Sequence, residues 1–166
     1  MLSLTDTLTE LASPWATSYN NSNVLSTLVT FAHLGGLLVA GGFALATDRA
    51  TLRFVPSGAE TDRTHLSELR GIHRPVLLGL LVTFVSGGLL LAADLESLLF
   101  APVFWLKMGL IVILLGNGAF LQRTERELWA GSARPERAWR RLRGSAWASL
   151  ALWFGSLLLG TALLAV

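Results

Sequence analysis

The sequence predicts an all-α membrane protein, an up-down bundle of four transmembrane helices preceded by a short N-terminal amphipathic helix, with both termini outside the cytoplasm. Three observations support this fold. Four long apolar stretches occur in 166 residues, only 14% of the residues are charged against about 25% in soluble domains, and the basic residues concentrate in two segments. The chain contains no cysteine, which excludes disulfides and thiolate metal sites.

The first 23 residues form a polar segment with one apolar stripe. The stripe has helical spacing and consists of Leu4, Leu8, Leu11 and Trp15. This pattern predicts an amphipathic helix on the outer membrane surface, which ends either at Ser13-Pro14 or in the polar run 19–23.

The first predicted transmembrane helix, 24–46, contains no acid, Lys or Arg. Its 23 residues are long enough to cross a hydrocarbon core of about 30 Å. One ionisable side chain, His33, lies near its middle, and Gly36 belongs to a series of small residues at four-residue spacing. An ionisable group at this depth is costly and indicates a functional site. Small residues allow another helix or a flat ligand to approach closely.

Three further transmembrane helices are expected at 75–93, 102–121 and 145–166. Pro75 suits a first helical turn, although residues 62–71 could extend this helix backwards. The polar segments 47–74 and 122–144 carry all twelve arginines, whereas the N-terminal segment and the 94–101 turn carry none. The positive-inside rule therefore places both Arg segments in the cytoplasm and both termini outside it. Trp105, Trp129, Trp139 and Trp147 fit interfacial belts.

The only basic residue outside the Arg segments, Lys107, lies in the third transmembrane helix. Counted from the outer surface, His33 is about 14 Å deep and Lys107 about 8 Å deep. Ser86 and Ser156 come to a similar level, so we expect a small polar pocket near the outer surface. Two simpler interpretations stay open, because His33 could form only a packing hydrogen bond and Lys107 could extend to the surface.

His73 is expected at the cytoplasmic side, near Asp48 and Arg49. Its depth differs from that of His33 by about 15 Å, whereas two axial ligands of one metal are only about 4 Å apart. The sequence thus disfavours one haem held by both histidines and leaves a haem with a single histidine, His33 or His73. His65 is expected to be solvated.

The pattern resembles small four-helix bacterial membrane proteins of the copper-resistance D family and the membrane-bound, haem-containing protoporphyrinogen oxidase. The resemblance covers about residues 30–120 and rests on short motifs: His33 followed by Gly-Gly, the exit Thr47-Asp48-Arg49, Ser86-Gly87-Gly88 and Phe104-Trp105-Leu106-Lys107. It implies haem or copper chemistry, with His33 and Lys107 at family-like positions. The chain has fewer Met and His residues than copper-resistance proteins use.

We therefore expect an inner-membrane protein that binds haem b or a related redox cofactor in its outer half, for electron transfer or an oxidase-like reaction. His33 would be an axial metal ligand or a proton carrier, and Lys107, Ser86, Gly36 and His73 complete the set of cofactor-binding candidates. The alternatives are an accessory subunit of a larger membrane complex and a copper-handling protein. Expected partners are the lipid bilayer and a membrane protein or further copies of this chain, and nothing indicates nucleic-acid binding.

Overall fold

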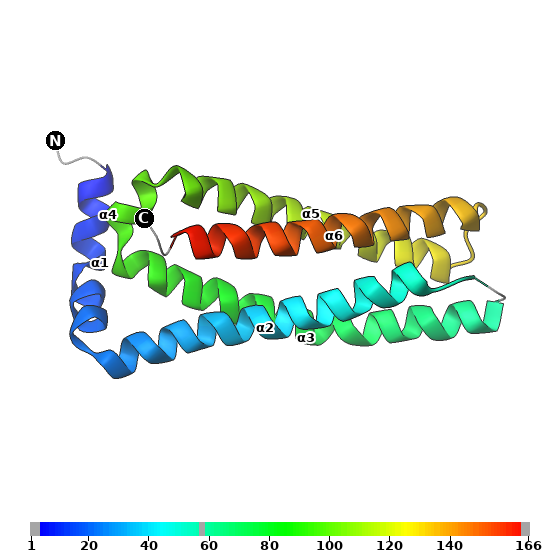
Figure 1. Cartoon of the computed structure of the whole chain (residues 1–166), viewed down its shortest axis with the longest axis horizontal. Coiled ribbons are helices and arrows are strands. Elements are labelled where there is room, and N and C mark those ends of the chain that lie inside the picture. Colours follow the sequence, from blue (N-terminus) through cyan, green and yellow to red (C-terminus); the bar gives the residue numbers. More distant parts are fainter. Residues whose placement is uncertain (1–3, 57–58, 164–166) are drawn as a thin grey trace.

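The computed structural model describes residues 4–56 and 59–163. These residues form six helices and no strand: α1 (Leu4–Asn21), α2 (Asn23–Arg53), α3 (Ala59–Ala93), α4 (Leu95–Phe100), α5 (Pro102–Trp129) and α6 (Pro135–Ala162). The four long helices run lengthwise, and α1 lies across one end of the bundle (Figure 1). The predicted all-α bundle is confirmed. Each of the four is long and apolar enough to cross a membrane, as in a multi-pass membrane protein.

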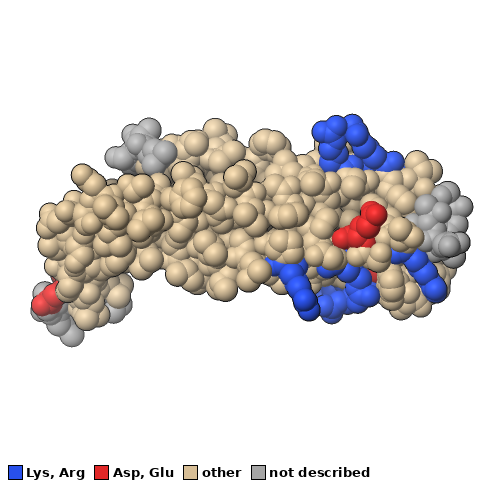
Figure 2. All heavy atoms as spheres, turned by 90° about the horizontal axis from the view of Figure 1, so that it is seen from below, with Lys and Arg blue, Asp and Glu red and all other residues tan. Residues whose placement is uncertain are grey.

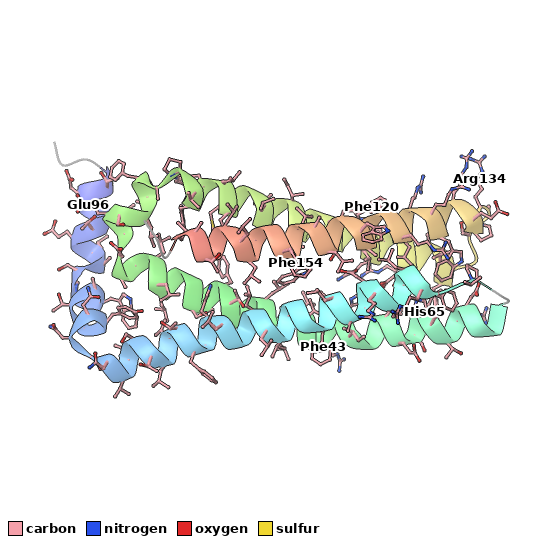
Figure 3. The ribbon with its side chains drawn as sticks, in the orientation of Figure 1. Phe43, His65, Glu96, Phe120, Arg134 and Phe154 are labelled. Carbon is pink, nitrogen blue, oxygen red and sulfur yellow. The ribbon has the colours of Figure 1, made fainter. Side chains whose placement is uncertain are left out.

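The two ends of the bundle differ in charge. The end that carries α1 is called the α1 end, and the opposite end, where α2 connects to α3 and α5 to α6, is called the Arg-rich end. Figure 2 shows the blue basic side chains gathered towards the Arg-rich end, and Figure 3 places Arg134 there and Glu96 at the α1 end. The uneven charge distribution of the sequence is thus a property of the folded bundle.

The helices extend well beyond the apolar stretches. The 31 residues of α2 reach about 46 Å, longer than the hydrocarbon core, and α3 begins at Ala59. Pro75 consequently lies inside α3, not in a first helical turn. Hydropathy marks only the lipid-facing part of a helix, whereas Arg, Leu and Ala also favour helix outside the membrane. Residues 164–166 of the last predicted helix lie outside the described residues.

The N-terminal helix α1 continues through Pro14 and ends in the asparagine-rich run. Ser22 then caps α2, because its side chain accepts a hydrogen bond from the Leu25 amide. The indole of Trp15 donates to the Leu89 carbonyl of α3 over 2.8 Å. This bond ties α1 to the end of the bundle.

The long helices pack in the order α3, α2, α6, α5, with only a small contact between α3 and α5. Small residues bring α2 and α3 together. A Cβ added to Gly36 would lie 2.6 Å from the Thr83 hydroxyl and 2.8 Å from the Gly79 carbonyl. In membranes, close backbone contact through small residues is a main source of helix association.

Two apolar clusters fill the bundle. One, near the Arg-rich end, contains Leu66, Leu69, Trp139 and Leu142. The other, nearer the middle, contains Ala40, Leu114 and Trp153. Trp139 is buried, unlike the interfacial tryptophan that the sequence suggested, because α6 already begins at Pro135 and carries this side chain into the first cluster.

Helices α5 and α6 are joined by a reciprocal pair of hydrogen bonds. The Asn117 amide donates to the Ser145 carbonyl over 3.0 Å, and the Ser145 hydroxyl donates to Asn117 Oδ1 over 2.9 Å. Both bonds lie inside the bundle, where water cannot replace them.

We expect Ser145→Ala to lower the free energy of unfolding by about 1 kcal/mol, because hydrogen bonds between membrane helices contribute roughly 0.6–1.7 kcal/mol. Denaturant titration of the purified protein in lipid nanodiscs measures the change. Ser67→Ala is the control, since the exposed Ser67 hydroxyl bonds only within its own helix. Equal effects of the two substitutions would contradict the proposed contribution of the Asn117 contact.

Candidate functional site

His33 projects from α2 against α3. Its Nδ1 lies 3.1 Å from the Thr83 carbonyl oxygen and 3.2 Å from the Ser86 hydroxyl. A carbonyl oxygen only accepts hydrogen bonds, so Nδ1 carries the proton and donates. The Ser86 hydroxyl donates to the Val82 carbonyl over 2.6 Å, which leaves its oxygen free to accept from His33. In the neutral imidazole, the second ring nitrogen, Nε2, then holds an unshared electron pair.

The imidazole ring lies against a glycine of α3. A Cβ added to Gly87 would lie 3.1 Å from His33 Cε1 and 3.4 Å from Nδ1. The first distance is tighter than ordinary van der Waals contact, so a larger residue at position 87 would push the ring away. Gly87 and the Thr83 carbonyl together fix the ring's position and its tautomer.

Lys107 of α5 faces the same region of the bundle. It is half-buried, and its Nζ lies 3.3 Å from the place that a Cβ would occupy at Gly160 of α6. Its ammonium group lies within electrostatic range of His33. Within residues 4–56 and 59–163, Lys107 has no ion pair or hydrogen bond through its side chain. Ser156, one turn before Gly160, is buried.

The predicted site residues thus fall into two groups. His33 and Ser86 are in direct contact, and Lys107 of the other helix pair lies within electrostatic range of His33. Gly36 lies one turn along α2 from His33 and contacts α3, where it serves as a helix-packing residue. The structure does not bring His73 into this group.

His73 forms a separate contact, because its Nε2 lies 2.8 Å from Glu125 Oε2. Glu125 is almost completely buried. The sequence interpretation missed this partner because it ended the third transmembrane helix at residue 121. A longer helix would have revealed Glu125 eight residues after Asn117 and on the same face.

His65 is buried, contrary to the solvated position expected from the sequence. Its ring stacks on Phe54, with centroids 4.1 Å apart and planes inclined by 5°. It also lies 6.1 Å from the Trp139 ring. Figure 3 shows His65 near the Arg-rich end, beside the last turns of α2. The signal for its burial is its place on the same helical face as Leu69.

No family model, curated protein or solved structure matches the chain. In the described part of the chain, no group of three or more His, Cys, Asp or Glu side chains could hold a metal ion.

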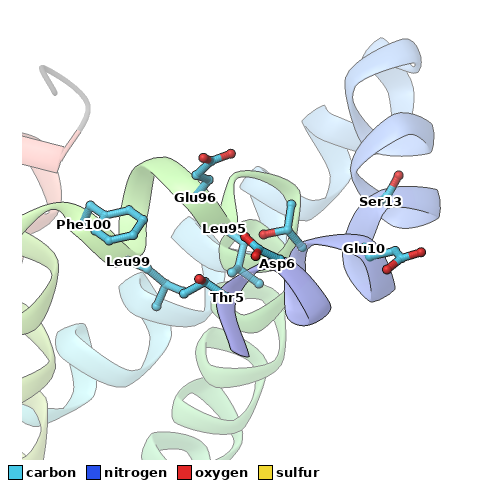
Figure 4. Close-up of a pocket in the computed structure, with 9 residues that line it drawn as sticks. Thr5, Asp6, Glu10, Ser13, Leu95, Glu96, Leu99 and Phe100 are labelled. Carbon is cyan, nitrogen blue, oxygen red and sulfur yellow. The ribbon is translucent and has the colours of Figure 1, made fainter. Parts of the chain in front are cut away.

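Two hollows lie at the α1 end, between α1 and α4. The larger, of about 480 Å³, is bordered by Asp6, Glu10 and Glu96 (Figure 4). The smaller, of about 290 Å³, lies beside Asp94 and Glu96. Neither hollow is lined by His33 or Lys107, so both are distinct from the polar group inside the bundle.

Proposed function

We propose that the protein binds haem b or a related redox cofactor in the half of the bundle nearer α1, with His33 as the axial ligand. The single observation that carries this proposal is the hydrogen bond from His33 Nδ1 to the Thr83 carbonyl. Histidines that ligate metals usually donate a hydrogen bond from their other ring N–H to a carbonyl or carboxylate. This bond fixes the ring and raises the basicity of the ligating nitrogen.

The donor set fits such a cofactor. His33 Nε2 has an unshared electron pair, and Lys107 supplies a half-buried cation without a side-chain partner in residues 4–56 and 59–163. We assign Lys107 to an anionic group, such as a haem propionate, or to a quinone oxygen. When bound, haem or a quinone supplies one-electron chemistry. The protein's own residues position the cofactor and exclude water from it.

We further propose that the protein resides in a bacterial inner membrane, with its Arg-rich end in the cytoplasm and its α1 end in the periplasm. The support is the distribution of arginine, which is concentrated in the two segments that meet at the Arg-rich end. His33 and Lys107 would then lie nearer the periplasmic surface, where the cofactor could exchange electrons with a periplasmic or membrane-bound partner.

The visible spectrum of the purified protein tests this proposal. We expect a Soret band and a positive pyridine haemochrome test in the wild type produced with sufficient haem. His33→Ala should abolish the band, because no other described histidine replaces this ligand in the same position. A colourless wild type that also fails to take up added haem would contradict the proposal.

The matched control is His73→Gln. His73 is bonded to Glu125 and lies apart from the His33 group, so this variant should keep the full Soret band. Loss of the band in both variants, with both still folded, would show that His33 has no special role. Size-exclusion chromatography and helical circular dichroism establish that each variant is folded.

A second candidate function is that of an accessory subunit, which α5 favours. Only 11% of the most apolar 18-residue stretch of α5 is buried, the lowest share among the four long helices. Its glycines Gly109, Gly116 and Gly118 have open space where a side chain would lie. A partner helix, from a larger complex or another copy of this chain, could pack there. Co-purification of a partner with a cofactor-free chain would favour this function.

The copper-handling alternative receives less support, because the described residues contain no suitable group of three His, Cys, Asp or Glu side chains. Soft sulfur ligands favour Cu(I), and the sequence contains two methionines and no cysteine. Metal analysis of the purified protein would distinguish copper from haem iron.

A further inference from the structure

Four buried polar atoms in the described residues lack a hydrogen-bond partner, and all of them come from the part of the bundle nearer the Arg-rich end. They are Asp48 Oδ2, His65 Nε2, Glu125 Oε1 and Arg143 Nε. An unsatisfied buried polar group costs about 1–3 kcal/mol. Three of the four residues, Asp48, His65 and Glu125, carry a side chain that can bind a proton.

Glu125 is the most deeply buried of these four residues. The residue is 2% exposed, its Oε2 contacts His73, and its Oε1 has no partner. The His73 side chain, in contrast, is 28% exposed. The His73 imidazole is thus partly exposed, while its Nε2 contacts a carboxyl group that is almost completely buried.

The neighbouring helices contribute further polar and charged groups. On α3, His65 lies within electrostatic range of Glu125, Glu68 and Asp62. On α2, Asp48 is almost completely buried, as is Ser149 on α6. Also on α6, Arg143 donates through Nη2 to the Phe54 carbonyl.

These side chains do not form a metal site, because no three His, Cys, Asp or Glu groups of the described chain are suitably placed. A proton fits the remaining geometry better. It needs a donor and an acceptor in hydrogen-bond contact, which His73 and Glu125 provide, and His73 is the partner that is partly exposed.

We propose that His73 and Glu125 form a proton-binding site that is reached from the Arg-rich end and is separate from the His33 group. A hydronium ion gives a proton to Nδ1 of the neutral His73 imidazole and becomes water, and the proton on Nε2 passes to the ionised Glu125 at Oε2. The products are a neutral imidazole and a protonated carboxyl group, so one proton has moved inward and has neutralised the carboxylate. A bound water molecule satisfies Glu125 Oε1. This site requires no cofactor.

Infrared difference spectroscopy of the full chain in lipid nanodiscs tests the site. We expect acidification to produce a carboxyl C=O band that Glu125→Gln removes. Asp48 is the other almost completely buried carboxyl group of this region, and acidification gives it a band of its own. Asp48→Asn is therefore the matched control, since it should remove only the Asp48 band and leave the Glu125 band in place. A spectrum that Glu125→Gln leaves unchanged at every pH at which the protein stays folded would overturn the proposal, and so would the loss of every carboxyl band in Asp48→Asn.

The role of His73 is tested by deuterium exchange of the same band. His73→Gln keeps a hydrogen-bond donor beside Glu125 but cannot relay a proton. We expect its exchange to be slower by about 100-fold, the smaller of the effects typical of a positioned proton-transfer group. Exchange as fast as in the wild type would overturn the proposed route. If His73 had a purely structural role, the exchange rate would be unchanged in a folded His73→Gln variant. The helical circular dichroism spectrum establishes that the variant is folded.

Discussion

Gly79→Ala is expected to lower the free energy of unfolding by about 3 kcal/mol, the upper end of the usual cost of overpacking. An added Cβ would lie 2.7 Å from the Ala40 amide nitrogen and 2.8 Å from the Gly36 carbonyl oxygen. Both atoms belong to the α2 backbone, which cannot rotate away as a flexible side chain can. The two helices would have to separate along their contact.

Gly88→Ala is the control for this prediction. Gly88 belongs to the same helix, but nothing lies within 4 Å of its added Cβ, so its replacement should leave stability unchanged or raise it slightly. Denaturant titration in nanodiscs compares the two variants. If they have equal stability, α2 and α3 do not approach each other as closely as the structure shows.

The same contact connects stability to the candidate site. His33 lies one turn of α2 from Gly36, and its ring depends on the Thr83 carbonyl of α3. Separation of the helices at Gly79 would therefore lengthen the bond that fixes the His33 tautomer. On the proposed function, Gly79→Ala should also reduce cofactor occupancy, whereas Gly88→Ala should not.

Much of this part of the molecule could be predicted from the sequence. The uninterrupted apolar stretch around His33 identifies a membrane helix, and the rise per residue places Ser86 at a matching depth. The structure shows these two side chains 3.2 Å apart. The small-residue series of the first helix predicted close packing, which Gly36 and Ala40 provide.

The Arg-rich end was less predictable. The apolar stretches end at the membrane boundary, but α3 and α5 continue beyond them as helices. His65 and Glu125 are polar residues in Arg-rich segments, so their sequence context indicates solvent. Their burial depends on which helices meet outside the apolar region, as Phe54 and Trp139 do around His65. Periodicity within one helix does not contain that information.

The second large effect on stability is expected from Trp153→Ala, which should also cost about 3 kcal/mol. Trp153 is buried in the central cluster with Ala40 and Leu114. Lipid is as apolar as this cluster, so the loss arises mainly from the packing contacts and the cavity, and less from transfer out of water. Trp147→Ala, at an exposed position of the same helix, should change stability by less than about 0.5 kcal/mol.

A double-mutant cycle with Gly41 identifies the contact responsible. A Cβ at Gly41 would lie 3.3 Å from Trp153 Cε3, so Gly41→Ala should destabilise the wild type by pressing on the indole. In the Trp153→Ala background the indole is absent, and the same methyl group enters the space that it leaves. We therefore expect Gly41→Ala to change from destabilising to neutral or stabilising, with a coupling free energy of about 1 kcal/mol. Additive effects in unfolding titrations would mean that α2 and α6 do not meet at these two residues.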